Sequence, residues 1–600
     1  MKAENFFLIM VVLVTTSLGK VGFAQVRYDL HSKPAGLEII GRTSVNKTGH
    51  SIAIGDINGD GKGDLIIGAP GLDSLSRQLE GRVYVFFGSA WIGGQRDLNT
   101  ESADLEIVGS QPHAGLGTAV ISADVNGDQI DDLIMSAPGT TVNNREKVGT
   151  VSIIFGKASF PAQMTTSDAE VQIHGEAEFD EFGEALAIGN VNRDDYNDLI
   201  VGVPLADLPD ISNAGKVFVF HGVIDWSSSI DLSRGTADLT VLGVRENQFM
   251  GNAVAAGDLN NDGWDDLIIG NFKANSDVGF IDIGKTYVLF MSDSTQKQID
   301  LAVDDPDITV SGESGQDHLG ISVTSGDFNG DGLTDLVVGA RRADDGDPVN
   351  AGKVYVFEND GAWPDEINLA ADTSDITIVG AADVVNFEIS LAFGKVDNDD
   401  IDDLIIGAPF SSPEARTQSG KLFVFLGRST FPVKAKFKTD VSDVVVVGAA
   451  ATHLLGNAVA VGDINGDGQG DIVVAAEDAE PAGRVYVLLG AVLTSIDSPN
   501  ADFALPETFQ LQQNYPNPFN AGTTISLEVP ANAGSFEVTV FNVHGQKVNT
   551  LFKGAAQPGL MKLHWDGSDA SGRAVGSGVY LYSLKSGDSV SIQKKLVLLK

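Results

Sequence analysis

The stretch DINGDGKGDLIIGAP at residues 56–70 carries Asp or Asn at its first, third, fifth and ninth positions, and an apolar run follows at once. Its nine-residue acidic loop recurs six more times, with starts at 124, 190, 258, 327, 395 and 463, so that successive spacings are 68, 66, 68, 69, 68 and 68 residues. A period this regular predicts one structural unit copied seven times along the chain.

Each copy contains four short runs that are rich in Val, Ile and aromatic residues. In the first copy these are HSIAIG (50–55), DLIIGAP (64–70), GRVYVFFG (81–88) and LEIVG (105–109). Short β-branched and aromatic runs bounded by Gly or polar loops are typical of strands. Four strands in each of seven units predict an all-β fold, a seven-bladed β-propeller. A repeat solenoid is the alternative.

The two ends of the repeat region indicate how the propeller closes. A copy of the fourth run, LEIIG at residues 37–41, stands alone before the first loop, whereas the last third run at 483–490 has no fourth run after it. We therefore expect residues 37–41 to form the outer strand of the last blade, which pairs an otherwise open edge. The propeller would then span residues 37–490, and a solenoid gives no reason for the displaced strand.

Two further motifs indicate a resemblance to a known family. A Phe-Gly or similar pair occurs before the first run at Phe182-Gly183, Leu116-Gly117, Met250-Gly251, Leu319-Gly320 and Leu455-Gly456, and Gly-Ala-Pro ends the second run at residues 68–70 and 407–409. Over residues 37–490 this pattern resembles the FG-GAP repeat of integrin α-subunit propellers and their bacterial relatives. The resemblance implies a short calcium loop between the first two strands of a blade, and ligand recognition on the opposite face.

The acidic loop brings hard oxygen donors close together. Ca²⁺ takes about six to eight oxygens at about 2.3–2.6 Å, and side chains at positions 1, 3, 5 and 9 with the carbonyl of position 7 can converge on one ion. We predict calcium as the cofactor. The predicted ligands are Asp56, Asn58, Asp60, Lys62 and Asp64; Asp124, Asn126, Asp128, Ile130 and Asp132; Asn190, Asn192, Asp194, Tyr196 and Asp198; Asp258, Asn260, Asp262, Trp264 and Asp266; Asp327, Asn329, Asp331, Leu333 and Asp335; and Asp463, Asn465, Asp467, Gln469 and Asp471.

Other interpretations of the loop are weaker, and the seven copies are not equal. An EF-hand fails because position 12 is Ile67 and strands flank the loop. A solvated acidic turn is the alternative, although such close carboxylates repel one another without a cation. Five loops keep Asp-Asn-Asp-Asp, whereas Asn190 opens the third and predicts a weaker site. Lys395 opens the sixth, where we expect no calcium and an internal salt bridge with Asp397, Asp399 and Asp403.

Composition restricts the partners and the compartment. The net charge of −43 excludes nucleic acid and anionic membranes as partners and suits divalent cations. With no Cys, neither disulfides nor thiolate metal sites are available. The apolar run at residues 6–18 is too short to span a bilayer and has the length of a signal-peptide core, so we assign residues 1–25 to a signal peptide. An N-terminal membrane anchor is the alternative; no other membrane span is predicted.

The C-terminal part forms a separate unit. A linker at residues 491–508 leads to alternating apolar residues and Gly-rich turns over residues 509–600, which predict a small immunoglobulin-like β-sandwich. Its motifs are NYPNPF (514–519), His544-Gly545, Trp565-Asp566-Gly567 and Ser577-Gly578-Val579-Tyr580. They are similar to those of the C-terminal sorting domain of the type IX secretion system. That resemblance implies this secretion machinery as a partner and the outside of a Gram-negative cell as the location. An ordinary accessory sandwich is the alternative.

Two classes of function remain open. Variable loops between the second and third strands lie opposite the calcium loops in a four-strand meander, and loops on a rigid scaffold are where binding usually resides. This predicts a secreted or surface binding protein for an extracellular glycan or protein, without a catalytic residue. The alternative is a polysaccharide lyase on a calcium-stabilised propeller, which needs a base and a neutralising cation in one cleft. The overall acidity disfavours a polyanionic substrate, and no such constellation is evident.

The sixth loop offers a direct test of the predicted ligand positions. Replacing the ammonium group by a carboxylate in Lys395→Asp gives the loop an Asp at each of positions 1, 3, 5 and 9. We expect the variant to bind one calcium ion more than the native chain at saturation, as measured by equilibrium dialysis. An unchanged stoichiometry would contradict the ligand assignment.

Overall fold

The structure is a computed structural model of the 600-residue chain. It describes residues 26–42, 46–71, 80–89, 93–276, 281–293, 296–344, 350–380, 387, 390–397, 399–413, 416–429, 435–439, 442–480, 482–490, 510–511, 517, 519, 522–529, 535–555, 559–571, 573–586 and 590–599. The chain divides into two compact units, Met1–Ser495 and Ile496–Lys600. The predicted signal peptide, the predicted linker at 491–508 and residues 514–516 and 518 lie outside the described residues.

The first unit contains seven five-stranded sheets among its described residues. The first strands are β3 (Ile52–Gly55), β8 (Val120–Ala123), β13 (Ala185–Gly189), β18 (Val254–Gly257), β23 (Leu319–Gly326), β28 (Ser390–Gly394) and β33 (Val459–Gly462). The second strands are β4 (Asp64–Ala69), β9 (Asp132–Ala137), β14 (Asp198–Val203), β19 (Asp266–Asn271), β24 (Asp335–Ala340), β29 (Asp403–Ala408) and β34 (Asp471–Ala476).

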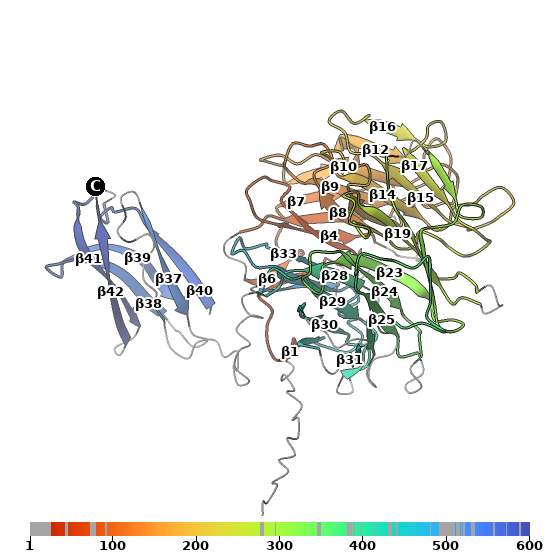
Figure 1. Ribbon diagram of the computed structural model, residues 1–600. Helices are drawn as coiled ribbons and strands as arrows, with labels where there is room; N and C mark the ends of the chain where they lie inside the picture. Colours follow the sequence, from red (N-terminus) through yellow and green to blue (C-terminus); the bar gives the residue numbers. More distant parts are fainter. Residues whose placement is uncertain are drawn as a thin grey trace, which may run out of the picture. The chain divides into compact units, whose positions relative to one another are not determined.

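The outer strands follow the same order. The third strands are β5 (Arg82–Phe86), β10 (Thr150–Ile154), β15 (Lys216–Phe220), β20 (Lys285–Leu289), β25 (Lys353–Phe357), β30 (Lys421–Phe425) and β35 (Arg484–Leu488). The fourth strands are β7 (Leu105–Val108), β12 (Val171–His174), β17 (Leu239–Leu242), β22 (Ile308–Ser311), β27 (Ile376–Val379), β32 (Val444–Val447) and β2 (Leu37–Ile40). Figure 1 shows the strands of the second blade, β8, β9, β10 and β12, side by side.

The sheets form a closed ring. The first strands contact one another in the cyclic order β3, β8, β13, β18, β23, β28, β33 and back to β3. Strand β2 pairs antiparallel with β35, with Leu37 opposite Val487 and Ile39 opposite Val485. The predicted all-β propeller is therefore observed, and a solenoid with two free ends is not.

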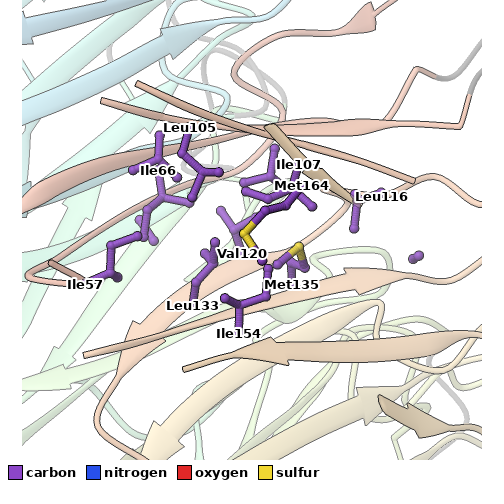
Figure 2. Packing of buried hydrophobic residues seen from close by; sticks show 14 of the residues in the cluster. Ile57, Ile66, Leu105, Ile107, Leu116, Val120, Leu133, Met135, Ile154 and Met164 are labelled. Atoms are coloured by element: carbon purple, nitrogen blue, oxygen red, sulfur yellow. The ribbon is translucent and has the colours of Figure 1, made fainter. Parts of the chain in front are cut away.

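Burial explains why the second strands read as continuous apolar runs. Every residue of all seven second strands is buried, because the sheets of the two adjacent blades cover both faces. Figure 2 shows one such interface between the first two blades, where these side chains pack together: Ile57, Ile66, Leu105, Ile107, Leu116, Val120, Leu133, Met135, Ile154 and Met164.

Each blade has a fifth strand that the sequence analysis did not anticipate. These strands are, from the first blade to the seventh, β11 (Gln163–Thr165), β16 (Ser229–Asp231), β21 (Gln298–Asp300), β26 (Glu366–Asn368), β31 (Ala435–Lys438), β1 (Val26–Asp29) and β6 (Gly94–Asp97). Each pairs parallel to a fourth strand but belongs to the segment that precedes the fourth strand of the next blade. Four strands per unit is therefore an underestimate, and neighbouring blades exchange strands around the whole ring.

A short turn anchors several of these exchanged strands. The backbone N–H of the second residue after Asp97, Asp231, Asp300, Asn368 and Asp29 donates a hydrogen bond to that side chain. In the sixth blade the guanidinium of Arg416 binds both carboxylate oxygens of Asp29, at 2.8 and 2.6 Å, and the carbonyl of Gly448 at 2.9 Å. The N-terminal segment thus fixes two blades, the sixth through β1 and the seventh through β2.

The second unit is a pair of sheets. One contains β36 (Gln510–Leu511), β37 (Thr523–Val529) and β40 (Gly559–Trp565); the other contains β39 (Lys547–Ala555), β38 (Ser535–Asn542), β41 (Gly578–Ser586) and β42 (Val590–Leu598). Trp565 is buried between them and contacts Phe519 and Tyr580. This arrangement agrees with the predicted immunoglobulin-like sandwich. Among the described residues, no helix of either unit is long and apolar enough to cross a membrane.

The closing strand can be tested against its counterpart in another blade. Ile39 in β2 and Ile107 in β7 occupy the same register and are both fully buried. Truncating a buried Ile to Ala costs about 2–5 kcal/mol. We expect Ile39→Ala and Ile107→Ala to lower the thermal unfolding midpoint of the full chain by similar amounts in scanning calorimetry. A near-neutral Ile39→Ala beside a destabilising Ile107→Ala would contradict closure by β2.

Candidate metal loops and the opposite face

The ninth residue of each acidic loop is a fully buried Asp that joins the loop to the third strand. In the first loop, Asp64 accepts the backbone N–H of Ile57 at 3.1 Å and that of Gly88 at 2.8 Å. The same pair of contacts recurs at Asp132, Asp198, Asp266, Asp335, Asp403 and Asp471. The position-9 carboxylate therefore has a structural role in all seven blades.

Positions 1 and 5 shape the turn itself. Asp56 accepts the N–H groups of Asp60 at 3.0 Å and of Gly61 at 2.7 Å, and Asp60 accepts that of Lys62 at 3.1 Å. Asp124, Asp258, Asp327 and Asp463 repeat the first pattern. Asn190 accepts only the N–H of Asp194, and its amide donates to the carbonyl of Asp194. The third loop is thus built differently at the position where its sequence departs from the others.

The third and seventh positions complete the predicted ligand set. Asn126, Asn192, Asn260 and Asn329 accept the N–H of the position-5 residue, and Asn58, Asn126 and Asn465 donate an amide N–H to the position-9 carboxylate. The seventh residues, Lys62, Ile130, Tyr196, Trp264, Leu333 and Gln469, are half-buried. Ile130 and Tyr196 lie against Gly59 and Gly127 of the preceding loop, so their side chains join neighbouring loops.

The donor chemistry fits a hard divalent cation, although the carboxylates are engaged in the turn. Each well-formed loop has three carboxylates, one amide and one carbonyl within nine residues. Turning the Asn58 amide over would place its oxygen about 3.0 Å from Asp64 Oδ1, a contact between oxygens that a cation stabilises. Among the described residues, no group of three or more His, Cys, Asp or Glu side chains surrounds a common metal position.

Burial and neighbouring charges raise the pKa of the position-9 carboxyls. Desolvation, followed by the charges of Asp56 and Asp60, raises the pKa of Asp64 to about 7. Desolvation likewise raises the pKa values of Asp132, Asp266, Asp335 and Asp403 to about 7 and those of Asp198 and Asp471 to about 6. Such a carboxyl gains more from a nearby cation than a solvated one does.

The sixth loop differs from the prediction in one respect. The Lys395 side chain is exposed, and within the described part of the chain it forms no ion pair with Asp397, Asp399 or Asp403. The internal salt bridge is therefore not found, because an exposed ammonium keeps its hydration at little cost. The carbonyl of Lys395 instead accepts the N–H of Gly470 at 2.8 Å.

The sequence analysis missed the eighth position, where an Asp in three of the loops binds the preceding loop. Asp131, Asp265 and Asp402 accept the N–H at the first position of the preceding loop, at 2.9, 2.7 and 3.1 Å. Their own N–H groups donate to the carbonyl of that same residue. The signal was an Asp doublet at positions 8 and 9, as in IDD and WDD. These contacts join neighbouring acidic loops at one end of the propeller.

The opposite face is built from rigid hairpins. The links between blades donate backbone N–H groups to the loop of the preceding blade; for example, Phe179 donates to Glu146 and Glu181 to Lys147, at 3.0 and 3.1 Å. The links after the third, fourth and sixth blades do the same, at residues 247 and 249, 316 and 318, and 452 and 454. These link residues have φ near +60° despite being non-glycine. Backbone strain of this kind clusters at functional sites.

Comparison with known proteins supports the propeller. The FG-GAP repeat model matches residues 48–86, 182–220, 250–279, 319–357 and 455–488. The FlgD Ig-like domain model matches residues 513–589. The FG-GAP repeat is thus found in five of the seven blades. The finer resemblance of the C-terminal unit to a type IX sorting domain stays a prediction.

The propeller is similar to parts of two longer proteins. Phosphatidylinositol-glycan-specific phospholipase D of Bos taurus is 28% identical over 403 residues, which are 64% of this chain and 46% of that protein. Integrin alpha-V of Gallus gallus is 28% identical over 235 residues, 38% of this chain and 20% of the integrin. The chain therefore spans less than half the length of these relatives. PorZ of Porphyromonas gingivalis, described as a surface component of the type-IX secretion system, aligns over 92% of this chain and 70% of that chain with TM-score 0.22 and 12% identity, too low to carry an argument.

The raised pKa values predict an unusual dependence of stability on pH. In a chelating buffer we expect the thermal midpoint to fall as pH rises from about 4 to about 7, because in this window the native state binds more protons than the unfolded state. Saturating calcium should make the slope shallower. Asp403→Asn removes one such group in the loop where no calcium is expected and should reduce the slope in chelator. Scanning calorimetry measures both effects, and a midpoint that rises with pH in chelator would contradict the assignment.

Proposed function

We propose that this chain is a secreted or cell-surface calcium-binding propeller that recognises a glycan or protein ligand through the face opposite the metal loops. The observation that carries the proposal is the difference between the two ends of the ring. One end repeats the same acidic loop, whereas the other presents hairpins of differing sequence in a fixed backbone frame. A rigid scaffold with variable loops lowers the entropic cost of recognition.

Calcium would be held by positions 1, 3, 5, 7 and 9 of the five loops that open with Asp, more weakly in the third loop, and not in the sixth. Its contribution would be to stabilise the folded ring, since an ion that binds only the native state shifts the unfolding equilibrium. The absence of Cys makes such stabilisation useful in an exported protein. Within this proposal the residues of the chain hold and orient the loops, and the ion neutralises their charge.

The location belongs to the same proposal. The FG-GAP repeats, the similarity to integrin alpha-V and the predicted signal peptide favour the outside of the cell. The predicted sorting domain would direct a Gram-negative cell to export the chain through its type IX secretion machinery. The names of the phospholipase relatives give them a hydrolase activity. More than half of the Bos taurus protein has no counterpart in this chain, so we do not extend that activity to it.

Affinity electrophoresis of the full chain through gels containing different polysaccharides tests this function, with calcium and with chelator. We expect one polymer to retard the chain only when calcium is present. A matched pair of variants locates the contact: Phe179→Ala lies on the variable face and Ile224→Ala beside the metal loops, and both side chains are exposed. Retardation should weaken only for the first. No retardation by any polymer, and no protein captured by pull-down, would contradict the proposal.

A further inference from the structure

One blade departs from the others at a position that is normally filled by an aromatic ring. The third residue of the third strand is buried in every blade, and in six of them it is Tyr84, Phe218, Tyr287, Tyr355, Phe423 or Tyr486. In the second blade it is Ser152, which is 2% exposed. The first residue of the same strand is Arg or Lys in those six blades and Thr150 in the second. Two large side chains are thus replaced by two small hydroxyl residues in one blade.

A cavity of about 260 Å³ lies where these side chains are missing. Ser152 and Thr150 line it, together with Thr140 and Asn143 from the loop between β9 and β10 and Gln172 and His174 from β12. This volume is far above the roughly 10–15 Å³ that one water molecule requires and approaches the size of small-molecule pockets. Because that loop belongs to the variable face, the cavity opens at the end of the ring that the proposed function uses.

The walls of the cavity are already held in place. Thr150 Oγ1 lies 3.0 Å from His174 Nδ1, Gln172 Nε2 donates to the carbonyl of Thr166 at 2.7 Å, and Gln111 Oε1 accepts the N–H of Thr141 at 3.1 Å. Ser152 is 2% exposed, and it is one of the residues that line the cavity. Its hydroxyl group is therefore a candidate hydrogen-bond donor and acceptor for a molecule that enters the cavity.

The lining restricts the chemistry of that ligand. None of the fourteen lining residues is Asp, Glu, Lys or Arg, in a chain with a net charge of −43. Burial lowers the pKa of His174, so this ring is neutral near pH 7. An ion would find no opposite charge, and a purely apolar molecule would displace water from the hydroxyl and amide groups of the lining without replacing its hydrogen bonds. Hydroxyl and amide groups at this density match a neutral polyhydroxylated molecule.

We propose that the cavity between β10, β12 and the β9–β10 loop binds one neutral sugar unit, the end or branch of a glycan, through Ser152, Gln172 and Asn143. This inference rests on the proposed glycan recognition. It assigns that recognition to one cavity and to neutral sugars as the class of ligand. Keeping an unfilled cavity in one blade costs packing contacts that the aromatic ring makes in the others, and the ligand would restore part of them.

The test fills the cavity with the residue type found in the other blades. Neutral hexoses and N-acetylhexosamines are titrated into the full chain by calorimetry and ligand-observed NMR, with glucuronic and galacturonic acids as charged counterparts. Ser152→Tyr should abolish sugar binding while keeping or raising the thermal midpoint. Ser152→Ala keeps the space and removes one hydrogen bond, so affinity should fall about ten-fold. Tyr84→Phe, at the same register in the first blade, is the control and should change nothing.

The outcomes separate the cavity from the proposed function. If a neutral sugar binds and Ser152→Tyr removes both that binding and the retardation in polysaccharide gels, the cavity is the glycan site. If a polysaccharide retards the native chain and Ser152→Tyr equally, glycan recognition stands and the cavity proposal is overturned. If no neutral sugar binds the native chain, the cavity proposal is overturned whatever the gels show. Should Ser152→Tyr fail to fold, an unchanged affinity in Ser152→Ala and Gln172→Leu overturns it.

Discussion

Closure of the ring is the constraint on which the rest of the propeller depends. Seven sheets bury their second strands only if each has a neighbour on both sides, so an open ring would expose two apolar faces. The chain meets this requirement with β1 and β2, which complete the sixth and seventh blades from the N-terminal end. Because every blade also takes its fifth strand from the next, the joint between first and last blades is built like the other six.

The acidic loops serve two physical purposes that the sequence alone does not separate. The position-9 carboxylate binds two backbone N–H groups in all seven blades, including the loop that opens with Lys395. That loop has lost the first predicted ligand, yet Asp403 keeps its contacts with Val396 and Gly427. The ninth position is thus required by the fold, whereas the first position varies between Asp, Asn and Lys. The predicted calcium binding concerns a different set of positions, because it also requires the side chains at the first and fifth positions.

Strands with an apolar run could be predicted from the sequence. Strands without such a run could not be predicted. Runs such as DLIIGA and RVYVF predict buried strands, and LEII at residues 37–40 predicts the closing strand. The fifth strands SID and QID are three residues long, partly exposed, and paired with a different blade, so neither length nor pattern distinguishes them from a turn. The recurrent Asp-Leu that ends several of them was the available signal. The position of the Lys395 side chain could not be predicted from the sequence, because water competes with the nearby carboxylates for its ammonium group.

The exchange of strands also fixes the order in which the molecule can be completed. Leu37 pairs with Val487, 450 residues later in the chain, and Val26 pairs with Val444. Loop-closure entropy rises only slowly with this separation, so the pairing is affordable at equilibrium, but long-range pairing of this kind is slow. A chain that emerges with its N-terminus first therefore leads with β1 and β2, whose partners β32 and β35 follow only with the sixth and seventh blades. The native ring can close only after both of these blades have emerged.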